Sequence, residues 1–64
     1  MRLTEFWWRM ERHLGKDYAD SWARDQVIGE LGSRTVYEAL DAGEYPKVVW
    51  RAVCDVLELP ANER

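Results

Sequence analysis

The chain has 64 residues, of which 47% are hydrophobic and 33% are charged. This length suffices for one apolar core, close to the lower limit at which a fold holds without disulfides or metal, and four Trp residues supply large surfaces for that core. A net charge of -3 excludes a global attraction to nucleic acid or anionic lipid, and the single cysteine excludes an internal disulfide.

Charged residues interrupt the apolar ones throughout the chain. No run of about 18 apolar residues is present to span a bilayer. The first residues, MRLTEFWWRMERHLG, carry charges where a signal peptide needs an uninterrupted apolar stretch. One unpaired cysteine fits a reducing compartment. We therefore expect a soluble, cytoplasmic protein without a membrane partner.

Gly and Pro divide the chain into four segments with helical periodicity. No segment alternates with period two, and no Asn-Gly or Asp-Gly pair marks a hairpin. The sequence therefore predicts an all-α fold, a compact single domain of about four short helices that covers residues 1–64.

The first helix is predicted to begin after Thr4, whose hydroxyl can cap free backbone N–H groups, and to end at Gly15. At about 100° per residue, five apolar side chains share one third of its circumference. These are Leu3, Phe6, Trp7, Met10 and Leu14. Trp8 lies about 140° from the centre of this stripe, on the face predicted to be wet.

Two interpretations of Trp8 remain open. Its ring can lie along the helix under Arg12, one turn further on, or meet a neighbouring helix at the margin of the core. Alternatively, Trp8 is a contact anchor for another chain, with Arg12 beside it, because exposed Trp often dominates interface energy.

The second helix is predicted from about Asp17 to Leu31, closed by Gly32. Its apolar positions spread most of the way around the helix, so it should contact neighbours on more than one side. These positions are Tyr18, Ala19, Trp22, Ala23, Val27, Ile28 and Leu31. We expect Trp22 to be a core residue.

The third helix is predicted to begin at Thr35, which has capping-box spacing to Glu38, and to end at Gly43. The fourth begins with Pro46 at its first position and stops before Pro60. Its apolar side, which should face the core, consists of Val49, Trp50, Val53, Val56 and Leu57.

The third and fourth helices, joined by a short turn, have the outline of a helix-turn-helix. Counted from Gly43, Ala39 stands where the first helix needs a small residue, and Val49 and Ala52 can face inward. This pattern keeps DNA binding open as an alternative function.

Charge and side-chain type argue against that alternative. Glu38 and Glu44 occupy positions that are usually apolar, and no Asn or Gln lies between residues 46 and 58. Lys47 and Arg51 are the basic residues available for nucleic-acid contact, and two acidic residues follow them.

Few residues in the sequence could catalyse a reaction or bind a metal or cofactor. His13 and Cys54 are the only residues of their types, and nothing in the sequence joins them as a base and a nucleophile. No CxxC, HxxxH or carboxylate-rich loop offers metal ligands, and no glycine-rich loop offers a phosphate site. We expect no catalytic residue, cofactor or metal, hence no enzyme, with Cys54 as a small apolar residue near Trp50.

Four strings carry a resemblance to a known family: MRLTEFW, SWARDQV, LGSRTVYEALDAG and PKVVWRAVCDVLELP. They resemble small actinobacterial proteins classified only as a domain of unknown function. The likeness covers nearly the whole chain but implies no activity or site residue. In this family the genes tend to lie near those of a DNA recombinase and its regulator, which implies a DNA-repair setting. Trp8 and Tyr45 depart from the family's usual residues.

The sequence thus favours a non-enzymatic module that binds an unidentified protein partner, with Trp8 and Arg12 as contact residues. The alternative is a helix-turn-helix DNA-binding protein that uses Lys47 and Arg51.

Overall fold

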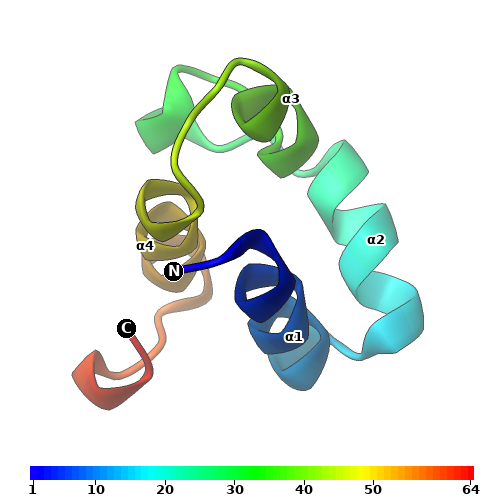
Figure 1. Ribbon diagram of the computed structural model, residues 1–64, viewed down its shortest axis with the longest axis vertical. Coiled ribbons are helices and arrows are strands. Elements are labelled where there is room, and N and C mark those ends of the chain that lie inside the picture. The colour runs from blue at the N-terminus through cyan, green and yellow to red at the C-terminus, as the bar shows by residue number, and fades with distance from the viewer.

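Four α-helices and two short 3₁₀-helices make up the computed structural model, which describes residues 1–64 (Figure 1). They are α1 (Leu3–Leu14), α2 (Lys16–Asp25), η1 (Gly29–Leu31), α3 (Val36–Asp41), α4 (Pro46–Leu57) and η2 (Ala61–Glu63). The prediction of a small all-α domain with four helices is confirmed. None of the helices combines the length and apolar character needed to cross a membrane.

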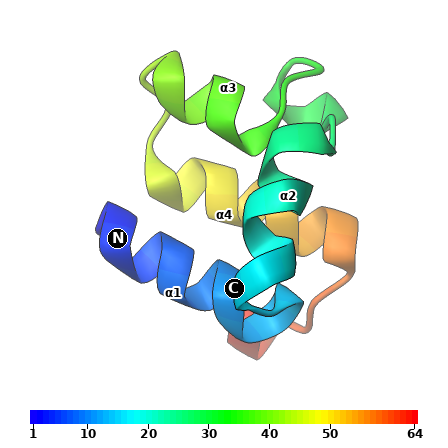
Figure 2. The same cartoon turned by 90° about the vertical axis from the view of Figure 1, so that its right-hand side faces the viewer.

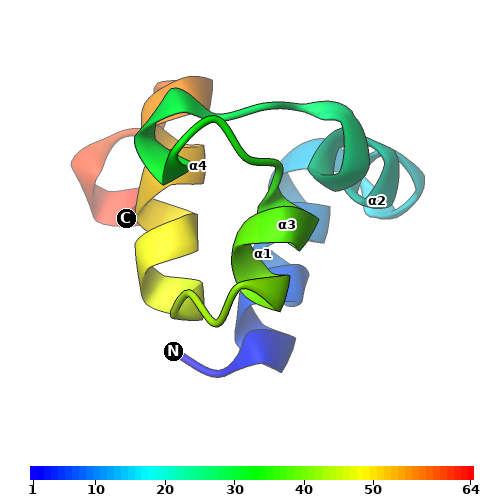
Figure 3. The same ribbon diagram turned by 90° about the horizontal axis from the view of Figure 1, so that it is seen from above.

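The four helices follow one another around a shared core (Figures 1 and 2). α1 packs on α2 and α4, and α3 packs on α2 and α4. Seen from above, the C-terminal segment lies beside α4 (Figure 3). This arrangement brings the last residues of the chain close to the first helix, as the contacts described below show.

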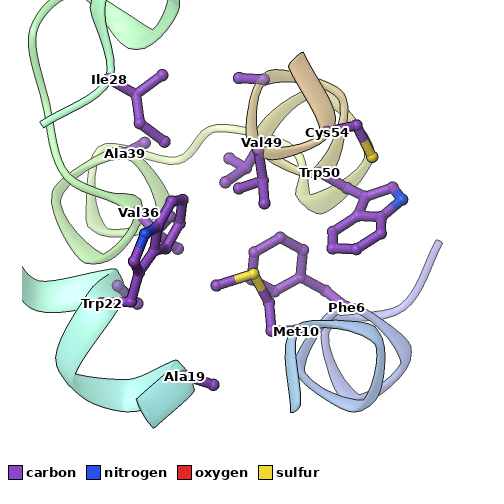
Figure 4. Close-up of a cluster of buried hydrophobic side chains, with 13 residues drawn as sticks. Phe6, Met10, Ala19, Trp22, Ile28, Val36, Ala39, Val49, Trp50 and Cys54 are labelled. Carbon is purple, nitrogen blue, oxygen red and sulfur yellow. The ribbon is translucent and has the colours of Figure 1, made fainter. Parts of the chain in front are cut away.

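Thirteen buried hydrophobic side chains from all four helices and the segment between α2 and α3 form the core (Figure 4). Phe6 and Met10 enter from α1, while Trp22 enters from α2. Trp22 and Trp50 are 8% and 1% exposed, which confirms both as core residues. Cys54 is also fully buried, as predicted.

The start of α1 differs from the prediction. The helix begins at Leu3 with Arg2 as its N-cap, and no side chain caps it. The carbonyl of Arg2 accepts the N–H of Phe6 at 3.0 Å. Extending the helix past Thr4 adds backbone hydrogen bonds at little further cost, since propagation is cheaper than nucleation. Leu3, in this first turn, is 49% exposed, so its placement in the core stripe was wrong.

α2 ends at Asp25 rather than Leu31. Beyond it the chain is extended, and Ile28 forms an isolated antiparallel bridge to Arg34, whose carbonyl accepts the Ile28 N–H at 2.9 Å. Ile28 is 1% exposed. Burying Ile28 through this bend outweighs the few hydrogen bonds that a longer helix would add across Gly29, a residue unfavourable in helices by about 1 kcal/mol.

The predicted boundaries of α3 and α4 are confirmed where their signals are local. Thr35 and Glu38 form a reciprocal capping box, and Pro46 opens α4. Gly43, between the two helices, has a φ of 92°, which glycine adopts without steric cost. Val56 is 41% exposed in the last turn of α4, so its assignment to the core was wrong.

Candidate functional site

The two adjacent tryptophans of α1 have opposite environments. Trp7 is half-buried, with its ring edge-on to Phe6 at 5.2 Å between centroids and tilted against Tyr37 at 5.1 Å. Trp8 is 59% exposed, and the guanidinium carbon of Arg12 lies 5.5 Å from its ring centroid. The cation–π stack predicted from their i, i+4 spacing is therefore present.

Trp8 and Arg12 also line a surface hollow of about 150 Å³, which we call the Trp8 hollow. Its other lining residues are Arg9, His13, Asn62 and Glu63. Sites for drug-sized ligands occupy about 300–1,000 Å³. The Trp8 hollow is smaller, and its size suits a single side chain.

The C-terminal segment forms one wall of the hollow because it is tied to both α1 and α4. The backbone carbonyl of Glu63 accepts the indole N–H of Trp50 at 3.2 Å, and its carboxylate lies 3.3 Å from Nε2 of His13. Arg64 forms an ion pair with Asp55 and donates to the carbonyl of Leu59 at 3.2 Å. These contacts fix η2 against the two helices.

The basic side chains around the hollow differ in whether a carboxylate faces them. Arg9 pairs with Glu5 at 2.8 Å, and His13 faces Glu63. Arg12 forms no ion pair and instead lies over the Trp8 ring. Its charge is therefore available to an anionic group that enters the hollow.

Cys54 lies beneath the same C-terminal segment, with Sγ 4.0 Å from the carbonyl oxygen of Glu63. Burial raises the pKa of the Cys54 thiol above its ordinary value, which works against the thiolate that a nucleophile needs. The His13 side chain faces the carboxylate of Glu63, and no contact joins it to Cys54. No three His, Cys, Asp or Glu side chains come together as a metal-binding group.

Lys47 and Arg51 lie one turn apart on α4, where both are exposed and neither forms an ion pair. They line no part of the Trp8 hollow. The inward positions of the helix-turn-helix comparison, Ala39, Val49 and Ala52, are all buried. Glu38 and Glu44, which occupy positions that are usually apolar in this motif, have local roles. Glu38 completes the capping box of α3, and the Glu44 carboxylate accepts the N–H of the next residue.

A separate polar cluster joins α2 to α3. The hydroxyl of Tyr37 donates to Asp20 at 2.5 Å, and Arg24 donates to the same carboxylate at 3.0 Å. The Tyr37 hydrogen bond, followed by that of Arg24, holds the pKa of Asp20 below its ordinary value. The Arg24 guanidinium also lies 4.9 Å from the Tyr37 ring centroid. We regard this cluster as a structural clamp between the two helices.

A comparison with known protein families identifies the family to which the chain belongs. The family model described as "Protein of unknown function (DUF3046)" matches residues 1–62. The chain belongs to this family. No curated protein and no solved structure matches it. The DUF3046 match includes every lining residue of the Trp8 hollow except Glu63.

Sequence reasoning found two of the six residues that line the hollow and missed four. Arg9 and His13 follow Trp8 and Arg12 by one position each, so helical spacing could have placed them on the same side of α1. Asn62 and Glu63 had no such signal, because their position depends on how the chain turns after Pro60.

Proposed function

We propose that this member of the DUF3046 family is a non-enzymatic module that binds another protein, with Trp8 and Arg12 at the centre of the contact surface. One observation carries the proposal: Trp8 is 59% exposed, stacked under Arg12, at the edge of a hollow. Trp and Arg are enriched among the residues that dominate interface energy. A DNA-repair or recombination setting is included in the proposal on the family resemblance alone.

The packing of α1 supports this role because the fold does not use the outer face of Trp8. Trp7 supplies the contacts to Phe6 and Tyr37, whereas the contact described for the Trp8 ring is with an arginine of its own helix. A partner can therefore cover Trp8 without rearranging the core. The resemblance implies that Trp8 is not the family's usual residue, so the proposal concerns the present chain and not every relative.

The proposal is tested by capture of proteins from native lysate on the immobilised full chain and on a Trp8→Ala variant. Tyr18→Ala is the matched control, because Tyr18 is an aromatic residue of α2 with nearly the same exposure, 58%. We expect wild type and Tyr18→Ala to retain the same specific protein and Trp8→Ala to lose it. Retention by all three would contradict the proposal.

The partner can also be a second copy of the chain, and sedimentation separates this case. A concentration series of wild type and Trp8→Ala should show a dimer for the first and a monomer for the second if the contact is between copies. Monomers in both would leave the homodimer without support.

DNA binding through α4 is the second candidate, supported by the exposed and unpaired side chains of Lys47 and Arg51. Contact with phosphates releases counterions, so retention on duplex DNA should fall steeply between about 50 and 200 mM salt. The double variant Lys47→Gln/Arg51→Gln should reduce both the retention and its salt slope. Absent or salt-independent retention would remove this candidate.

A further inference from the structure

One cation at the Trp8 hollow has no carboxylate partner, although the whole chain carries a net charge of -3. The basic side chains of Arg9, Arg12 and His13 line the hollow together with one acidic residue. Two of these basic groups already face carboxylates of the chain, and Arg12 does not. An anionic group in the hollow would therefore find an unpaired guanidinium, which binds carboxylates in a planar, two-pronged geometry.

The chain itself shows that an acidic residue fits against this lining. The carboxylate of Glu63 meets His13, while its backbone carbonyl accepts the indole N–H of Trp50. A segment of polypeptide thus lies along α1 with its acidic side chain turned to a basic residue and its backbone held by a Trp. The contact is a precedent, within the same molecule, for a second acidic segment beside it.

Two further features favour a peptide over a larger anion. The hollow, at about 150 Å³, has room for one side chain. The exposed ring of Trp8 offers an apolar face to a flanking residue, and the Asn62 side chain, which makes no hydrogen bond within the chain, can pair with a peptide backbone.

We infer that the Trp8 hollow binds an acidic segment of a partner protein, in which an Asp or Glu carboxylate pairs with Arg12 and a neighbouring apolar side chain packs on Trp8. This inference rests on the proposed protein-binding function and specifies its partner's chemistry. The nearby carboxylates of Glu5 and Glu63 repel extended polyanions such as nucleic acid more than they repel a single carboxylate.

The test uses the ¹⁵N-labelled full chain and a blocked peptide with one carboxylate, acetyl-Gly-Glu-Leu-Gly-amide, followed by NMR up to about 10 mM peptide. We expect saturable shifts at the Trp8 indole N–H and at the backbone of Arg12 and Asn62. The Gln counterpart, acetyl-Gly-Gln-Leu-Gly-amide, should give at least about tenfold weaker binding, because it keeps the shape and loses the charge.

Arg12→Gln should weaken binding of the acidic peptide by about tenfold or more. Arg34→Gln is the matched control, since Arg34 is also exposed and unpaired but does not line the hollow, and it should leave binding unchanged. A decathymidylate strand and inorganic phosphate provide the other arms and should shift the Trp8 indole N–H less than the peptide does.

The inference is overturned if the acidic peptide gives no saturable shift at the hollow, if the Gln peptide binds equally well, or if the oligonucleotide binds there more tightly. Failure of this kind is distinct from failure of the proposed function. If the Trp8→Ala variant still loses a protein from lysate while the acidic peptide does not bind, protein binding stands and the partner has a different chemistry.

Discussion

Trp50 is the residue on which the packing of α4 against α1 depends most. Its side chain is 1% exposed, edge-on to Phe6 at 6.1 Å between ring centroids, and its indole N–H donates to Glu63 at 3.2 Å. Replacing a buried Trp by Ala costs about 3–5 kcal/mol. At about 0.05–0.15 kcal/mol per residue, a chain of this length has a total stability of about 3–10 kcal/mol. Trp50→Ala should therefore remove between a third and all of it.

The assay is denaturant and thermal unfolding followed by far-ultraviolet circular dichroism. At about 4–8 °C per kcal/mol for a domain of this size, Trp50→Ala should lower the thermal midpoint by roughly 12–40 °C or leave the chain unfolded. Trp50→Phe keeps an aromatic ring and loses the indole N–H, so it should cost less, about 1–2 kcal/mol. A Trp50→Ala variant with an unchanged midpoint would refute the described contact between α1 and α4.

Three further predictions follow from named contacts. Thr35→Ala should cost roughly 1 kcal/mol in denaturant unfolding, because it removes the capping-box acceptor, and an unchanged midpoint would contradict that role. Tyr37→Phe should raise the pKa of Asp20 toward its ordinary value. The ionised Asp20 carboxylate stabilises the fold at neutral pH, and this contribution, which is lost as the pH falls through the lowered pKa, should become smaller in the variant. Carboxyl ¹³C titration measures the pKa of Asp20, and an unchanged pKa would refute the hydrogen bond. Trp7→Ala should cost about 2–3 kcal/mol and Trp8→Ala no more than about 1, and equal losses in unfolding experiments would show that Trp8 is buried.

The features that the sequence predicts well are those set by neighbours along the chain. A capping box needs only the spacing of Thr35 and Glu38, and a cation–π stack on one helix needs only that of Trp8 and Arg12. Pro46 opens α4 for an equally local reason, since its missing N–H has no partner at that position in any helix. Each of these features is present in the structure.

The predictions are wrong where contacts between segments distant in sequence determine where a helix ends or which side chains are buried. The apolar periodicity of the α2 sequence continues through Ile28, because a buried Ile gives the same sequence pattern whether a helix or a bend buries it. The structure buries it through a bridge to Arg34. Similarly, Leu3 and Val56 continue apolar stripes but lie in the terminal turns of their helices and remain 49% and 41% exposed.

The candidate site combines both kinds of information. Its α1 side follows from helical spacing, while its second wall comes from a C-terminal segment that the helical pattern does not position. Glu63 links the two, because it contacts His13 at the surface and Trp50 in the core. The position of that wall therefore depends on correct packing of α4. Because the two walls come from segments far apart in the sequence, the hollow can be identified only from the folded structure. The adjacent tryptophans of α1 point in different directions for the same reason. Trp7 contacts Phe6 and Tyr37, and Trp8, on the other side of the helix, forms the edge of the hollow.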